Sequence, residues 1–288
     1  MNANIYIPQG MPCAEILQTS TYGLNEWCTI KGCLRVLFLN LMPVKADTEL
    51  DIVRTVGDCT NSKVQILPMK IKGQTYKTTP QQHMEQFYLD FEAYAPYLYD
   101  RFIITGAPLE QMPFEQVRYW PQLQQIMHWA DNHVERTLYI CWAAQAGLYE
   151  HYGINKCALG EKMFGIFSQT VLCKDSFLMR ELAPAFKMPN SRHTEVKRAD
   201  VEQASQQGLQ LIAASSESGV GVMASKDGRR TFIVGHLEYA ANTLDKEYKR
   251  DLSKQLPIKA PQHYYNDKGA IAYSWQKDAV KFYRNWLE

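Results

Sequence analysis

Short apolar runs, each closed by turn residues, recur along the chain. Residues 34–39 (LRVLFL) are rich in branched side chains and stop at an NLMP turn. Runs of this length and composition are typical of strands buried on both faces of a sheet. We therefore expect five buried strands, at 34–39, 63–69, 101–105, 137–140 and 230–234. Two further strands are expected on either side of a turn, at 209–213 and 221–224.

Segments with helical periodicity lie between these runs. In residues 47–56 the apolar positions Leu50, Val53 and Val56 recur every third residue, which places them on one face of a helix. Helices are also expected at 113–129, 141–154 and 242–251. Strands that alternate with helices predict an α/β fold: a mostly parallel sheet with helices on both faces, which binds ligands at the carboxyl ends of its strands.

The chain is long for one domain, but its composition suits one large core. It has 288 residues, of which 46% are hydrophobic, and α/β folds of this size often form a single unit. We expect one domain over residues 1–288, with the first thirty-odd residues and the aromatic-rich end from residue 259 packed on the core as extensions. These ends are also candidates for a homodimer interface.

Charge and cysteine content narrow the functional class. The 31 Lys and Arg nearly balance the 30 Asp and Glu, so no strong field would gather nucleic acid or an anionic membrane. The first residues lack a signal-peptide pattern, and no 18-residue apolar run occurs. Seven cysteines without a CxxC pair favour a reducing compartment over disulfides or zinc. We expect a cytoplasmic protein that binds small molecules, with no metal site and no bound cofactor.

Cys141 is the leading candidate for a nucleophile. It follows the expected strand 137–140 and opens an expected helix, a geometry that exposes a sulfur beside helix N–H groups able to stabilise a thiolate. A lone cysteine in a core is usually only a buried thiol. The neighbouring motifs decide between these interpretations.

The second motif is GHLEY at residues 235–239, which follows another expected strand. If the chain stays extended, His236 and Glu238 face the same side. A thiol, an imidazole and a carboxylate together supply a nucleophile, a proton shuttle and a group that orients the shuttle. The combination is typical of class I glutamine amidotransferase-like folds with a flavodoxin-like core. Glutamine hydrolysis would favour glycines beside the cysteine, whereas here Ile140 and Trp142 flank it.

Several motifs, in register over nearly the whole chain, resemble the homoserine O-acyltransferases of the MetA family. They are LNLMPVKADTE, ITGAPLEQMPFEQVRYW, YICWAAQAGLYEHYGI, SRHTEV, GHLEY and the final NWL. The resemblance implies a ping-pong reaction in which Cys141 takes an acyl group from acyl-CoA. A substrate hydroxyl then attacks, with His236 as general base and Glu238 orienting it.

The resemblance also implies further site residues. Lys162 and Ser191 would line the site, and Arg250 would bind the amino-acid carboxylate through its planar fork. In similar enzymes the position of Glu110 holds glycine in succinyl users and glutamate in acetyl users, so acetyl-CoA is the expected co-substrate. Lys45, in the MPVK turn, is a weaker candidate. Taken without the family, each of these could be an ordinary surface or turn residue.

The acceptor stays open between two amino acids. The chain departs from the usual GHPEYD pattern at Leu237 and Ala240, and it also carries Val44 and Asn190 where the family usually has other residues. L-Homoserine and L-serine differ by one methylene, which a pocket discriminates by only about 1–3 kcal/mol. We expect homoserine acetylation in methionine synthesis, with serine acetylation in cysteine synthesis as the alternative. Hydrolysis of a thioester or amide is a third interpretation.

Overall fold

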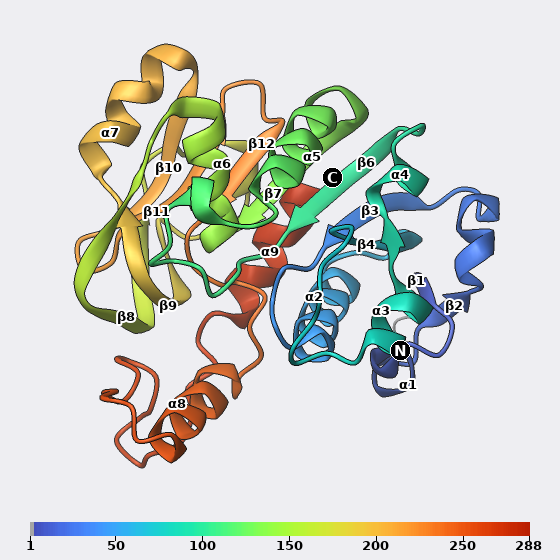
Figure 1. The fold of residues 1–288 in the computed structure, drawn as a ribbon. Coiled ribbons are helices and arrows are strands. Elements are labelled where there is room, and N and C mark those ends of the chain that lie inside the picture. Colours follow the sequence, from blue (N-terminus) through green and yellow to red (C-terminus); the bar gives the residue numbers. More distant parts are fainter. Residues whose placement is uncertain (1–2) are drawn as a thin grey trace.

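In a computed structural model, residues 3–288 form one sheet of twelve strands with helices around it (Figure 1). The strands are β1 (Ile5–Pro8), β2 (Ser20–Tyr22), β3 (Leu34–Leu39), β4 (Val64–Lys70), β5 (Leu89–Asp90), β6 (Tyr99–Ile104), β7 (Val134–Ile140), β8 (Lys156–Val171), β9 (Ala185–Val196), β10 (Leu209–Ser215), β11 (Gly219–Ser225) and β12 (Arg230–Ile233). The α-helices are α1 (Pro12–Leu17), α2 (Lys45–Cys59), α3 (Gln81–Phe87), α4 (Phe91–Tyr94), α5 (Trp120–His133), α6 (Trp142–Tyr152), α7 (Arg198–Gln203), α8 (Thr243–Ser253) and α9 (Gln276–Leu287).

The sheet has a parallel half and an antiparallel half. Its order is β2-β1-β4-β3-β6-β7-β12-β11-β10-β8-β9, with β5 beside β4. Every pairing from β2 to β12 is parallel, and every pairing from β12 to β9 is antiparallel. The mostly parallel α/β fold is thus confirmed. The sequence did not indicate β1, β2 or the long β8–β9 hairpin.

Alternate residues of the parallel strands face two separate apolar layers. Val36 and Phe38 of β3 pack in the cluster that contains α2 and α9, whereas Leu37 and Leu39 pack in the cluster that contains α5 and α6. A strand that is apolar on both faces must be covered on both, as β3 is. Helices therefore lie on both faces, as expected.

The helix predicted at 113–129 is wrong at its start. A short 3-10 turn covers Phe114–Gln116, and α5 begins only at Trp120. Pro121 explains the difference, because proline suits the first turn of a helix but lacks the N–H that a helix interior needs.

The C-terminal helix α9 packs against the parallel half. Phe282, Tyr283 and Trp286 are buried in the layer that also holds α2, and Arg101 of β6 donates from Nε to the Trp286 carbonyl at 3.0 Å. Among residues 3–288, every helix is too short or too polar to cross a bilayer.

Candidate active site

Cys141 occupies the sharp turn that joins β7 to α6. Its φ of 54° and ψ of −115° lie outside the usual regions for a residue with a side chain, a conformation that costs about 1–3 kcal/mol. Two backbone bonds hold the turn: the Cys141 N–H donates to the Ile233 carbonyl at 2.7 Å, and the Gln145 N–H donates to the Cys141 carbonyl at 3.2 Å. The turn presents the thiol at the first, unpaired N–H groups of α6.

Two glycines make room for this turn, although none flanks the cysteine. A Cβ on Gly106, in the loop after β6, would lie 3.2 Å from the Cys141 Cβ. A Cβ on Gly147 would lie 2.8 Å from the Phe232 ring, so only glycine lets α6 pack this closely on the sheet. The close approach that adjacent glycines usually allow comes here from elsewhere in the chain.

His236 and Glu238 form a buried pair beside Cys141. Ile140 and Ile233 are register partners in β7 and β12, so the residues that follow them meet at one edge of the sheet. The Nδ1 atom of His236 donates to Oε1 of Glu238 at 2.7 Å. β12 ends at Ile233, and the pair lies in a turn rather than in the extended chain that we expected. The Tyr239 ring stacks on the imidazole at 4.1 Å.

The surroundings of His236 favour its protonated form. Burial alone would lower the pKa of this imidazole, but the neighbouring Cys141 sulfur and the Glu238 carboxylate outweigh burial and raise the pKa well above its ordinary value. A proton taken from the thiol can therefore rest on His236, which gives the cysteine thiolate a partner of opposite charge.

Residues that the sequence did not reveal hold Glu238 in place. Arg54 of α2 donates to the Glu238 carbonyl at 2.6 Å, and Thr55 donates to the same oxygen at 3.3 Å. Tyr283 of α9 is buried near the carboxylate, and burial, with Glu238 as a further cause, raises the pKa of its phenol well above the usual value. No motif links these helices to GHLEY, so only the fold could identify them.

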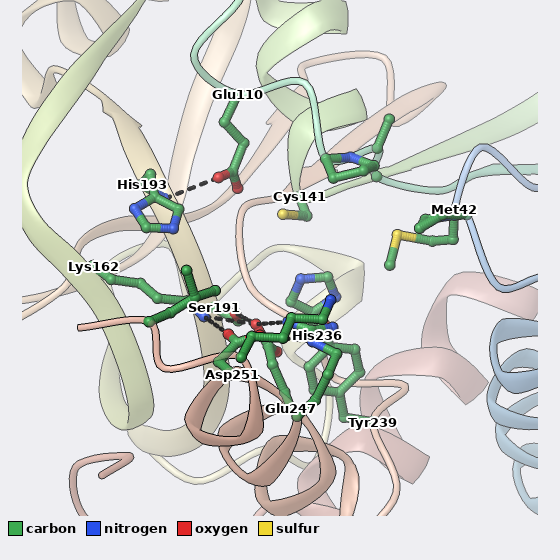
Figure 2. Close-up of a pocket in the computed structure, with 17 residues that line it drawn as sticks. Met42, Glu110, Cys141, Lys162, Ser191, His193, His236, Tyr239, Glu247 and Asp251 are labelled. Carbon is green, nitrogen blue, oxygen red and sulfur yellow. Dashed lines mark hydrogen bonds and ion pairs between the residues drawn. The ribbon is translucent and has the colours of Figure 1, made fainter. Parts of the chain in front are cut away.

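A pocket of about 390 Å³ opens over Cys141 (Figure 2). It brings together six of the eight residues singled out from the sequence. Glu238 lies behind His236, and Lys45 lines an adjoining groove instead. The six that line the pocket are Cys141, His236, Glu110, Lys162, Ser191 and Arg250.

Carboxylates of α8 tie the candidate substrate-binding residues together. Glu247 Oε1 lies 2.6 Å from the Lys162 Nζ and accepts a hydrogen bond from the Ser191 hydroxyl at 2.7 Å. Arg250 is bonded to Asp251 at 2.7 Å. Residues 247, 250 and 251 share one helix face, a spacing that the sequence contained and that we had not used.

Glu110 projects into the pocket on the side of His193. Burial raises the pKa of its carboxyl, and the hydrogen bond from the His193 backbone N–H, 3.1 Å long, acts in the opposite direction. His193 itself is exposed and lines the pocket, and its bond to Glu110 comes from the backbone rather than from the ring. Glu110 and Cys141 therefore line the same pocket.

Lys45 supports the turn that follows β3. Its side chain is 3% exposed, and Nζ donates to the carbonyls of Asn40 and Met42 at 2.5 and 2.7 Å. Burial lowers the pKa of this ammonium to about 8, although Glu49 acts in the opposite direction. Lys45 thus shapes the rim of the pocket without entering it.

Arg192 places a buried cation behind the pocket. It is 1% exposed and donates to the Thr194 carbonyl at 2.7 Å and to the Ser218 carbonyl. Burial lowers its pKa, while Cys141 and nearby carboxylates act in the opposite direction. The sequence had directed attention to its neighbours, Ser191 and His193.

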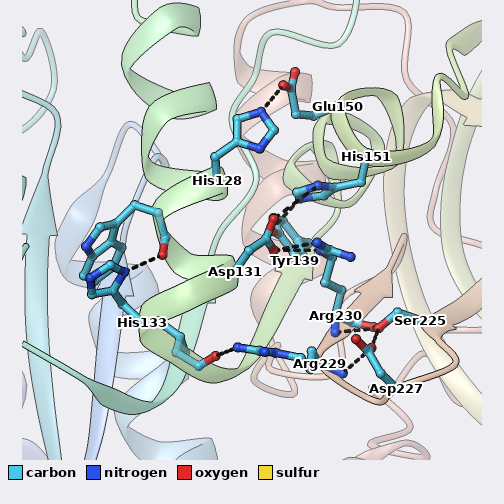
Figure 3. Close-up of polar contacts among 12 residues, drawn as sticks. His128, Asp131, His133, Tyr139, Glu150, His151, Ser225, Asp227, Arg229 and Arg230 are labelled. Atoms are coloured by element: carbon cyan, nitrogen blue, oxygen red, sulfur yellow. Dashed lines mark hydrogen bonds and ion pairs between the residues drawn. The ribbon is translucent and has the colours of Figure 1, made fainter.

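A second group of histidines and carboxylates lies away from the pocket, between α5 and α6 (Figure 3). The ligand atoms of His128, Asp131 and His151 lie within 4.8 Å of one another. Asp131 is bound to Arg230 of β12 at 2.7 Å. His128 and Asp131 are three residues apart on one face of α5, and the expectation that the chain has no metal site stays a prediction.

The sequence matches a known protein family over nearly its whole length. The family model described as homoserine O-succinyltransferase matches residues 4–288. A homoserine O-acetyltransferase of Bacteroides fragilis is 45% identical over 98% of this chain and 93% of its own. One of Geobacillus kaustophilus is 44% identical over 98% of this chain and 95% of its own.

Comparison with solved structures agrees on the fold. A glutamine amidotransferase of Thermotoga maritima superposes with a TM-score of 0.56 at 13% identity, covering 88% of this chain and 96% of that one. The glutaminase domain of Trypanosoma brucei CTPS with bound acivicin superposes with a TM-score of 0.53 at 12% identity, covering 80% of this chain and 97% of that one. The glutamine amidotransferase-like fold expected from the sequence is thus confirmed.

Proposed function

Because the chain belongs to the homoserine O-succinyltransferase family and is a homoserine O-acyltransferase, we propose that it moves an acetyl group from acetyl-CoA to L-homoserine through an acetyl-Cys141 intermediate. The observation that carries this proposal is the thiol of Cys141 at a strained helix start, beside the His236–Glu238 pair bonded at 2.7 Å. Such an arrangement suits acyl transfer through a covalent intermediate.

The first half-reaction forms the thioester. His236 accepts the Cys141 proton, and the thiolate attacks the carbonyl carbon of acetyl-CoA. N–H groups at the start of α6 stabilise the oxyanion. The bond to the coenzyme sulfur then breaks, and the imidazolium returns its proton to that sulfur as CoA leaves.

The second half-reaction transfers the acetyl group. His236, now neutral, takes the proton of the acceptor hydroxyl as the oxygen attacks the Cys141 thioester. Collapse of the intermediate restores the thiolate and releases the ester. Glu238 keeps the Nδ1 proton in place throughout, so that the other ring nitrogen faces the reacting atoms.

Glu110 supports the choice of acetyl-CoA. It extends into the pocket beside Cys141 and is largely enclosed. A succinyl group would bring a second carboxylate towards it, which a partly desolvated site disfavours. A neutral acetyl group meets no such repulsion.

Lys162, Ser191 and Arg250 are the proposed acceptor ligands. They are linked through the carboxylates of α8 on one side of Cys141. Arg250 would receive the amino-acid carboxylate, and Glu247 would receive the ammonium. The same groups fit serine, which remains the second candidate acceptor because its backbone groups are identical.

The test is an assay of all four pairings of acetyl-CoA or succinyl-CoA with L-homoserine or L-serine, in which CoA release is measured. We expect the fastest turnover with acetyl-CoA and homoserine. Mass spectrometry should find acetyl on Cys141 when the acceptor is omitted, and none in Cys141→Ala. Faster turnover with serine would make serine the acceptor and place the reaction in cysteine synthesis. Steady CoA release without any acceptor would favour a hydrolase.

The donor argument has its own variant. Glu110→Gly should increase turnover with succinyl-CoA relative to acetyl-CoA, because it removes the carboxylate and opens space. An unchanged ratio of turnover with the two donors would contradict the role proposed for Glu110 and leave the rest of the proposal in place.

Methionine synthesis and a cytoplasmic location are part of the same proposal. We also propose that residues 1–288 form one domain, since α9 shares its apolar layer with α2.

A further inference from the structure

A second, more apolar groove adjoins the Cys141 pocket. It measures about 330 Å³ and shares Met42, Pro43, Ala107 and Pro108 with the pocket, so the two lie side by side. One wall is the loop that follows β4, including Thr75, Tyr76 and Lys77. Figure 2 shows Met42 on the opposite side of Cys141 from Lys162 and His193. The groove therefore leaves the pocket away from the proposed acceptor ligands.

The floor of the groove is rigid. Lys45 Nζ lies 5.2 Å from the centre of the Tyr76 ring and holds two carbonyls of the NLMP turn. The backbone N–H of Lys45 donates to the Thr79 hydroxyl, at 3.2 Å, which ties this turn to the opposite wall. A preformed groove of this kind binds a flexible ligand without a further ordering cost to the protein.

Two exposed cations lie on or against the loop that forms this wall of the groove. Lys77 lines the groove and is exposed, and Arg118 is exposed and donates to the Gly73 carbonyl of the same loop at 3.1 Å. Neither forms an ion pair with a carboxylate among residues 3–288. Unpaired cations beside an apolar groove suit a ligand with a neutral arm and an anionic end.

We propose that this groove binds the coenzyme portion of the acyl-CoA donor, with the pantetheine arm along Tyr76 and the phosphates at Lys77 and Arg118. This inference rests on the proposed acyl-CoA donor. It gives each partner its own side of Cys141: the coenzyme on the Met42 side, the acyl substituent towards Glu110, and the acceptor at α8. A third cavity, lined by Lys162, Leu256 and Lys259, also reaches the pocket. Its two lysines are already paired with carboxylates, Lys162 with Glu247 and Asp251 and Lys259 with Glu161, so they are less available to phosphates than Lys77 and Arg118.

The test compares acetyl-CoA with acetyl-pantetheine, which lacks the nucleotide and its phosphates. Lys77→Glu and Arg118→Glu should each raise the KM for acetyl-CoA roughly tenfold, since each reversal replaces an attraction with a repulsion near a phosphate. The KM for homoserine and turnover of acetyl-pantetheine should stay at the wild-type values. Thr75→Trp, which fills the groove from an exposed position, should raise the KM for both donors.

The matched control is Lys259→Glu, the same charge reversal in the third cavity, which should leave the KM for acetyl-CoA unchanged. A rise with Lys259→Glu and none with Lys77→Glu would overturn the assignment. So would a wild-type KM for acetyl-CoA in Thr75→Trp. Failure of the wild-type protein to use acyl-CoA at all would instead contradict the proposed function, so the two failures are distinguishable. Binding of free CoA, measured by calorimetry, gives a readout that needs no turnover.

Discussion

Two buried histidines of this protein have carboxylate neighbours, and their surroundings affect their pKa values in opposite directions. His236 is bonded to Glu238 at 2.7 Å beside a thiol, and its pKa is raised well above the ordinary value. His151 lies 3.9 Å from Asp131, and burial together with the Arg230 guanidinium lowers its pKa to about 4. The two pKa values differ because His236 has the Cys141 sulfur as well as a carboxylate beside it, whereas at His151 burial and the Arg230 charge outweigh Asp131.

The largest test of this contrast is a pair of equal substitutions. His236→Asn should reduce acetyl transfer by roughly 10²- to 10⁴-fold, because no group is left to move the proton. His151→Asn should leave kcat close to wild type, since His151 lies away from the pocket. Steady-state kinetics on both folded variants checks this. Equal losses in the two variants would contradict the distinction.

The second test concerns the carboxylates. Glu238→Gln should lower kcat roughly a hundredfold, because an amide cannot stabilise the imidazolium. The pKa of His236, followed by NMR of its ring, should fall at the same time. The matched variant Asp131→Asn should change neither quantity. A Glu238→Gln variant that kept both the wild-type kcat and the wild-type His236 pKa would show that the pair is only structural.

The third test uses the pH dependence of stability. The folded pKa of His151, about 4, lies below its ordinary value of 6.5. The unfolded chain therefore binds the proton first as the pH falls, and the free energy of unfolding should decrease between about pH 6.5 and 4 by roughly 1–3 kcal/mol. In His151→Asn this component should be absent, as urea unfolding at several pH values would reveal.

Arg230→Met sharpens the same test. Without the guanidinium, Asp131 is free to pair with His151, and the pKa of His151 should rise. The loss of stability on acidification should still begin near pH 6.5, where the unfolded chain takes up the proton, but it should end at a higher pH and be smaller. An unchanged profile would mean that burial alone sets this pKa.

The smallest effect is expected at the outer histidine of the same group. The side chain of His128 is 60% exposed, and it bonds to Glu150 at 2.7 Å. Exposed pairs contribute about 0–1 kcal/mol, so His128→Ala should change the free energy of unfolding by less than about 1 kcal/mol. A larger loss would show that this pair supports α6 and hence the cysteine turn.

The sequence predicted the parallel half of the fold better than the antiparallel half. β3 is apolar and buried from Val36 to Leu39, because both of its faces are covered there, and its bounds agree with the prediction. β8 mixes Gly, Lys and Glu with apolar residues and contains a register shift between Ala158 and Met163, so its pattern has no single period. Hairpins of this kind are identified by pairing, which a single strand does not reveal.

Some residues of the site could likewise be predicted from the sequence, and others could not. Cys141 and His236 each follow a strand, and parallel neighbours end at the same edge, so their proximity could be inferred from local signals. Glu247 contacts Ser191, which lies 56 residues earlier in the chain, and Tyr283 comes from the C-terminal helix, so both contacts depend on how α8 and α9 dock. Family resemblance supplied Lys162, Ser191 and Arg250, because the residues alone could not be distinguished from ordinary surface or turn residues.

The division of the sheet at β12 has a consequence for how such an enzyme can diversify. The proposed coenzyme groove is built from loops after β3, β4 and β6 in the parallel half, whereas Lys162 and Ser191 come from the β8–β9 hairpin. Mutations in the hairpin or α8 would then change the proposed acceptor side and leave the proposed coenzyme groove in place, with the bond from His193 of β9 to Glu110 as the link between the two. Descendants of one ancestral gene could therefore exchange acceptors through drift in one half of the molecule while inheriting the other half intact.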